Sequence, residues 1–110
     1  MKIEDFRDTK KLHKKLKIGK TKLLAKKTLG DLFLINSVES MISIRGKVSL
    51  FDKLVLNKKP PILFTIRSDD NSFTVYEKNY FEQAIKLADK YEEFFEKEVT
   101  VNQSSYPINN

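Results

Sequence analysis

The chain lacks cysteine altogether, and its 110 residues include a single histidine, three glycines and three prolines. The absence of cysteine excludes disulfide scaffolds, thiolate zinc sites and cysteine nucleophiles. The sequence also has neither an apolar run long enough to cross a bilayer nor the apolar segment of a secretion signal, so we expect a soluble, cytoplasmic protein. A chain of this length buries enough surface for one modest core, which predicts a single domain.

Positive charge is concentrated at the N-terminus. The net charge is +6, but residues 1–28 hold eleven Lys or Arg against three acids, whereas residues 29–110 carry a net charge of −2. This imbalance predicts a basic N-terminal arm at residues 1–20, helical or disordered, before a nearly neutral domain at residues 21–101 and a polar tail at residues 102–110. The arm is the feature most suited to contact a partner.

The clearest element is the stretch from Asn79 to Lys97, which has the period of an amphipathic helix. Asn79 followed by Glu82 resembles a capping box, in which the Asn side chain accepts a backbone N–H at the helix start. The apolar stripe of this helix needs a cover, and the preceding strand-like segments are the candidates for it. The stripe consists of Phe81, Ala84, Ile85, Ala88, Tyr91 and Phe95.

Alternating apolar and polar residues predict five to six short strands. Residues 42–50 alternate strictly, and residues 62–67 and 73–76 flank an Asp/Asn turn, which is typical of a hairpin. We therefore predict an α+β fold, in which an antiparallel, strongly bent sheet or open barrel packs against the C-terminal helix. The remaining predicted strands are residues 32–36, 51–56 and 99–101. Gly19 is expected to end the helix of the N-terminal arm. Residues 21–27 are either a short strand or the last turns of a helix.

This order of elements resembles small bacterial pleckstrin-homology-like domains. The likeness covers residues 21–101 and lies in the succession of short strands, a last hairpin (ILFTIRSDDNSFTVYE) and an aromatic amphipathic helix. The resemblance implies an open barrel with the terminal helix plugging one end, and it assigns no functional residues. Other antiparallel α+β folds with one helix fit the same pattern.

Residues able to carry out catalysis are sparse. His13 lies among lysines with no carboxylate at helical spacing, so it lacks the partner that a general base needs. The sequence Gly19-Lys20-Thr21 fails as a phosphate-binding loop because position 14 is lysine where that motif needs glycine. Asp69 and Asp70 fit turn chemistry better than a metal site, since hard cations need several converging oxygens. We predict a protein that is not an enzyme and that needs neither a metal nor a cofactor.

Three binding hypotheses remain. The first is a small binding or regulatory protein whose lysines contact the backbone of DNA or RNA, because lysine outnumbers arginine eighteen to three and acts mainly as a point charge on phosphates. The candidate nucleic-acid-binding residues are Lys10, Lys11, Lys14, Lys15, Lys17, Lys20, Lys22, Lys26, Lys27, Arg45 and Lys47.

The second hypothesis is a pleckstrin-like module that docks on a protein partner or on an anionic membrane surface. The third is a self-associating structural subunit, in which Tyr80, Phe94 and Tyr106 would cover a homodimer interface. The first hypothesis is favoured because the arm carries charge without a coherent apolar side, which a membrane-surface helix requires. The apolar residues that fail to share one side are Ile3, Phe6, Leu12, Leu16 and Ile18.

Overall fold

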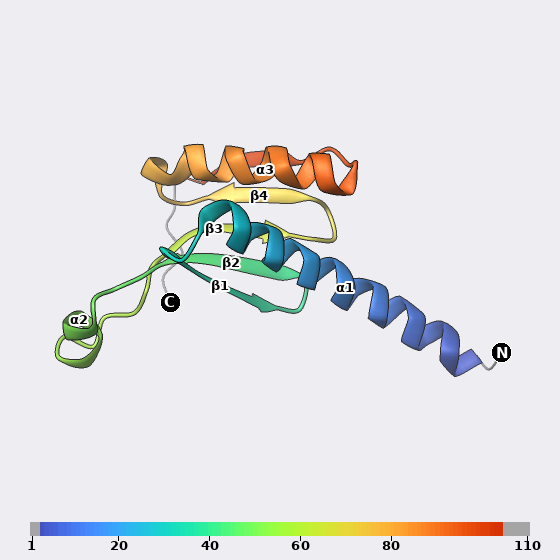
Figure 1. The fold of residues 1–110 in the computed structure, drawn as a ribbon, viewed down its shortest axis with the longest axis horizontal. Helices are drawn as coiled ribbons and strands as arrows, with labels where there is room; N and C mark the ends of the chain where they lie inside the picture. The colour runs from blue at the N-terminus through green and yellow to red at the C-terminus, as the bar shows by residue number, and fades with distance from the viewer. Residues whose placement is uncertain (1–2, 105–110) are drawn as a thin grey trace.

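The computed structural model describes residues 3–104, with side chains from residue 11 onward, and confirms the α+β class (Figure 1). Five strands form one open sheet in the order β1-β2-β3-β4-β5. The first three pairings are antiparallel, while β5 runs parallel to β4. The strands are β1 (Phe33–Val38), β2 (Met41–Gly46), β3 (Ile62–Arg67), β4 (Ser72–Val75) and β5 (Thr100–Gln103).

Two long helices, α1 (Ile3–Leu29) and α3 (Phe81–Phe95), contact each other and the sheet (Figure 1). A short helix, α2 (Leu50–Leu54), lies in the connection between β2 and β3, and a 3₁₀ turn, η1 (Lys78–Tyr80), precedes α3. The core lies where the helices meet the sheet, because one side chain in every two along β2 and β4 is buried there.

The register of the sheet explains which residues form this core. Ile44, Phe64 and Val75 are partners across β2, β3 and β4, and all three are fully buried. Tyr91 from α3 meets the ring of Phe73 edge-on, with 5.6 Å between the ring centroids. The predicted hairpin of β3 and β4 and the predicted edge strand near residue 100 are confirmed.

Gly19 does not end the N-terminal helix, so this prediction is wrong. Residues 3–29 form one continuous helix, and residues 21–27 are its last turns rather than a strand. The helix ends instead at Gly30, whose φ of +80° suits glycine and whose N–H donates to the carbonyl of Lys26 at 2.9 Å. The predicted boundary between residues 20 and 21 therefore falls inside α1.

The long strand predicted over residues 42–50 is also wrong beyond Gly46. There the Gly46 N–H donates to the carbonyl of Pro61 at 3.1 Å, and the chain leaves the sheet. Residues 51–56 are not a strand either, because the Ser49 hydroxyl accepts the Asp52 N–H at 3.1 Å and caps the start of α2.

The C-terminal amphipathic helix is confirmed, but its ends differ from the prediction. Asn79 lies in η1, so the expected capping box does not form, and the cap position belongs to Tyr80 without a side-chain hydrogen bond. The helix stops at Phe95, because Glu96 adopts a left-handed conformation with φ +54° while its N–H donates to the carbonyl of Glu92.

Candidate anion-binding surface on helix α1

Helix α1 has an inner side that joins the core. Thr21 and Ala25 are fully buried, and Ile18 and Leu24 pack against the core from the same helix. Residues 11–16 are exposed, and Figure 1 shows this N-terminal part of α1 running out beyond the sheet. The C-terminal half of α1 is therefore part of the domain, and its N-terminal half projects from it.

The outer side of α1 carries an apolar stripe that we call the leucine stripe: Leu12, Leu16, Gly19 and Leu23. These residues are spaced four, three and four apart, so they lie along one line of the helix, nearly opposite Thr21 and Ala25. The three leucines are 56%, 50% and 54% exposed. Ile18 lies on the inner side of α1, away from Leu12 and Leu16, so the expectation that these apolar residues do not share one side is confirmed for the described side chains, and the helix adds Leu23 to the line of Leu12 and Leu16.

Lysines flank the leucine stripe on both sides. At 100° per residue, Lys15, Lys22 and Lys26 lie on one side of it, and Lys20 and Lys27 lie on the other. Residues 11–29 contain eight lysines and no acidic residue. The outer surface of α1 is thus apolar along its middle and positive along both margins.

Lys17 is an exception among the lysines, because its ammonium points inward. Its Nζ donates to the carbonyl of Ser68 at 2.6 Å and to Asn71 Oδ1 at 3.0 Å, and Tyr91 donates its hydroxyl to the same Asn71 oxygen. Burial lowers the pKa of Lys17, and the nearby Lys97 charge lowers it further, with Asp69 opposing. This side chain joins α1 to the β3–β4 turn and is not presented to a ligand.

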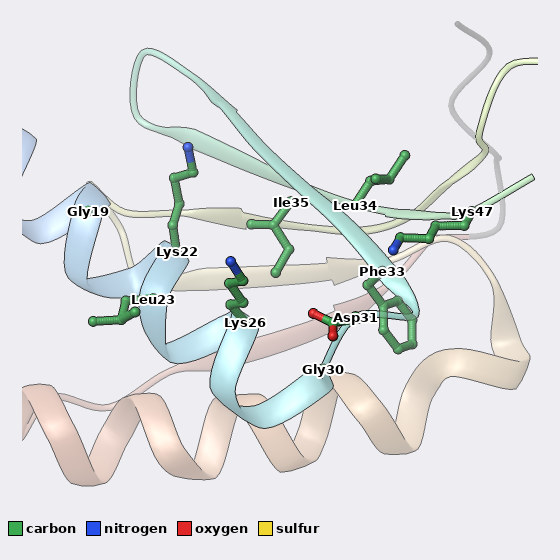
Figure 2. A pocket seen from close by; sticks show the side chains of 10 residues that line it. All are labelled: Gly19, Lys22, Leu23, Lys26, Gly30, Asp31, Phe33, Leu34, Ile35 and Lys47. Atoms are coloured by element: carbon green, nitrogen blue, oxygen red, sulfur yellow. The ribbon is translucent and has the colours of Figure 1, made fainter.

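A cleft of about 530 Å³ lies between α1 and the edge strand β1. Figure 2 shows Lys22 and Lys26 on α1 bordering it, with Lys47 at its far end and the ring of Phe33 against it. Asp31 is the one carboxylate among the side chains that line this cleft. Three ammonium groups against one carboxylate make the cleft a suitable place for an anionic group beside the leucine stripe.

The other residues predicted to bind nucleic acid do not gather at this cleft. Lys11, Lys14 and Lys15 are exposed on the projecting half of α1, close to the β1–β2 turn where they border a hollow with Glu39. Arg45 donates through Nη1 to the carbonyl of Pro60 at 2.9 Å, so it stabilises the base of the β2–β3 connection. Lys10 lies on α1 among residues 3–10, whose side chains are outside the description, and Tyr106 is also outside the described residues.

The two adjacent aspartates act in the β3–β4 turn, as predicted. Asp70 Oδ1 accepts the Ser72 hydroxyl at 2.6 Å and the Ser72 N–H at 3.2 Å, and these bonds and the nearby Arg67 lower its pKa. Among residues 11–104, whose side chains the structure describes, no three His, Asp or Glu side chains are grouped to hold a metal ion. The helices in this range are too short or too polar to cross a membrane.

Comparisons of the chain with protein-family models, with curated proteins and with solved structures find no match. The resemblance to pleckstrin-homology-like domains therefore stays a prediction.

Sequence reasoning missed the leucine stripe because it ended the helix at Gly19. Once the helix continues, Leu23 extends the line of Leu12 and Leu16 through Gly19. The signal was present as the four-three-four spacing, but the inner apolar side of α1 obscured it. A helix with apolar residues on two opposite sides has little net amphipathic character, although each side is coherent.

Proposed function

We propose that this protein docks on anionic membrane surfaces through the outer side of α1. The observation that carries this proposal is the exposed leucine stripe with lysines on both margins. An interfacial helix needs an apolar side that enters the boundary between headgroups and acyl chains, and basic residues that meet the headgroup phosphates. Nucleic-acid backbones use the lysines but leave the leucines without a role.

The magnitudes favour a reversible association. A lysine near an anionic leaflet contributes about 1 kcal/mol, and this contribution falls off within a Debye length. A leucine gains about 1.5–3 kcal/mol when it moves from full exposure to full burial, so three half-exposed leucines contribute a few kcal/mol when they are partly inserted. Both sets of residues contribute, and together they support binding that weakens as salt increases.

Self-association through the leucine stripe is disfavoured by its margins. Two copies pairing along the stripe would bring Lys15, Lys22 and Lys26 of one copy close to lysines of the other, and residues 11–29 offer no carboxylate to compensate. Coiled-coil pairs usually place opposite charges at such flanking positions. The charge pattern therefore favours an anionic partner over a second copy.

Nucleic acid is the second candidate, and one observation favours it. Lys11, Lys15, Lys22 and Lys26 lie along one line of α1 that spans about 22 Å. Such a row fits successive phosphates, and it would give salt-dependent binding that tolerates any sequence. This candidate gives a binding role to the lysines alone and predicts that replacing the leucines leaves nucleic-acid binding unchanged.

Vesicle sedimentation distinguishes the two candidates. We expect the full chain to sediment with vesicles of mixed phosphatidylcholine and phosphatidylserine, and to stay in the supernatant with phosphatidylcholine alone. A parallel titration with a short DNA duplex and with an RNA of mixed sequence, at low and at physiological salt, measures the alternative. Tight duplex or RNA binding without sedimentation on anionic vesicles would replace the membrane proposal by the nucleic-acid one.

A further inference from the structure

The connection between β2 and β3, residues 47–61, is a second exposed apolar feature. We call it the α2 excursion. None of the residues of α2 is buried, and Leu50, Phe51 and Leu54 are 71%, 63% and 71% exposed. Val55 and Leu56 follow directly and are also exposed. Such a continuous apolar surface on a small protein marks an interaction site.

The α2 excursion is a formed structure with a fixed base. At the base, the Gly46 N–H and the Arg45 side chain bond to the carbonyls of Pro61 and Pro60. At the tip, the Lys58 N–H donates to the carbonyl of Asp52 at 3.0 Å, which closes the chain back onto α2. The apolar side chains are therefore held out from the sheet on a defined turn of helix.

The charge around this tip points to the chemistry of its partner. Residues 47–59 contain four lysines and one acid, Asp52. An apolar tip in a segment with this excess of lysine complements a surface that is anionic outside and apolar beneath, as a bilayer with acidic headgroups is. The same segment of a second copy carries the same excess of positive charge and would repel it.

The α2 excursion and the projecting half of α1 leave the sheet at opposite ends of the molecule. In Figure 1, both reach below β1, beyond the edge of the sheet that lies away from α3. The cleft between α1 and β1 connects the two features, because Lys22 and Lys26 of α1 line it together with Lys47, the first residue of the α2 excursion.

We propose that the α2 excursion is a second membrane contact, which inserts Leu50, Phe51 and Leu54 among the acyl chains of an anionic bilayer while α1 lies on the headgroups. This inference rests on the proposed function. It assigns the deeper insertion to α2, and to α1 the interfacial contact made by the leucine stripe and its flanking lysines.

Tryptophan fluorescence tests the insertion directly, because the chain contains no tryptophan. Phe51→Trp places one reporter at the tip, and Phe94→Trp places a matched reporter on α3, where Phe94 is 54% exposed. On phosphatidylserine-containing vesicles we expect the Phe51→Trp emission to shift to shorter wavelength and to be quenched by lipids brominated on their acyl chains. We expect the Phe94→Trp emission to keep its wavelength.

A second variant measures the contribution to binding. Leu50→Ser, Phe51→Ser and Leu54→Ser combined should weaken vesicle partitioning at least about tenfold, because three apolar side chains lose their transfer into the bilayer. The urea midpoint should stay unchanged, since none of the three is buried. Wild-type affinity of this variant for the vesicles would overturn the inference.

The outcomes separate the inference from the function on which it rests. If the wild-type chain sediments with anionic vesicles while the Phe51→Trp emission stays constant, the α2 inference fails and the proposed function stands. If the chain does not sediment at all, both fail. If the Phe51→Trp emission shifts with protein concentration in the absence of lipid, the tip contacts another copy, which also overturns the inference.

Discussion

The lysines of α1 differ in what their ammonium groups contact. Lys17 donates to Ser68 and Asn71, and its Nζ also lies 6.0 Å from the ring centroid of Phe95. Lys20, only three residues later, is exposed on the other side of the helix. A structural role for Lys17 and a binding role for Lys20 follow from this difference, and composition alone treats the two as equivalent.

Lys17→Met should therefore change the stability of the fold, and Lys20→Met should change binding to vesicles. Losing the Lys17 hydrogen bonds should lower the free energy of unfolding by about 1 kcal/mol while the apolar stem of the side chain is kept. Urea unfolding measures this loss, and Lys20→Met should change it by less than about 0.5 kcal/mol. On anionic vesicles, Lys20→Met should weaken partitioning about fivefold and folded Lys17→Met should bind like the wild type. The reverse pattern would show that the assignment of these two lysines is wrong.

Tyr91 gives the stability a defined pH dependence. Burial raises its pKa above the ordinary 10.0, although a hydrogen bond with Thr21 opposes the shift. Because the folded state keeps the proton more tightly, this stabilisation is complete below about pH 10 and is lost as the pH rises through the folded-state pKa. The lowered pKa of Lys17 makes its own contribution to stability rise with pH in the same alkaline range. The two chains that are compared must therefore both contain Lys17.

The measurement is urea unfolding of the wild type and of Tyr91→Phe at about pH 9 and about pH 11. We expect the wild type to lose more free energy of unfolding between these two conditions than Tyr91→Phe does. Equal losses would mean that the Tyr91 hydroxyl titrates alike in the folded and unfolded chains.

At the scale of elements, α1 depends on two glycines in different conformations. Gly19 lies inside the helix, with no atom within 4 Å of where a Cβ would stand, whereas Gly30 has a positive φ. Glycine inside a helix costs about 0.5–1 kcal/mol relative to alanine, and alanine at a positive φ is strained.

Gly19→Ala should thus raise the free energy of unfolding by about 0.5–1 kcal/mol, and Gly30→Ala should lower it by about 1 kcal/mol. Thermal or urea unfolding of the two single variants provides the comparison, and each serves as the control of the other. If Gly19→Ala were destabilising, residue 19 would not lie in a regular helix, and the leucine stripe would lose its geometric basis.

The sequence predicted those elements whose signal is local. The hairpin around the Asp/Asn turn and the aromatic stripe of α3 follow from alternation and from helical spacing, and both are present. The end of β2 was not predictable, because Val48 and Leu50 continue the alternation while the Gly46 N–H pairs with Pro61 far along the chain. The exposed α2 excursion was missed for the same reason, since its residues have the apolar character of a buried strand.

At the scale of the whole molecule, the core covers some apolar side chains and leaves others exposed. The inner side of α1 and the apolar face of α3 complete the core with the sheet. The leucine stripe and the α2 excursion remain outside it, and both belong to segments with an excess of lysine. The sequence predicted the charge of this surface but not its apolar part, because only the fold determines which leucines the core leaves exposed.

The most direct test of the account is the vesicle partitioning of a variant that removes the leucine stripe while keeping every charge. Leu12→Gln, Leu16→Gln and Leu23→Gln combined should keep the helix, because glutamine and leucine have similar helix propensity. Phe94→Gln, which removes a comparably exposed apolar side chain from α3, is the control. We predict that the triple variant binds phosphatidylserine-containing vesicles at least about tenfold more weakly than the wild type, and that Phe94→Gln binds equally well. Undiminished binding by the triple variant would contradict the proposal that the leucine stripe contacts the membrane.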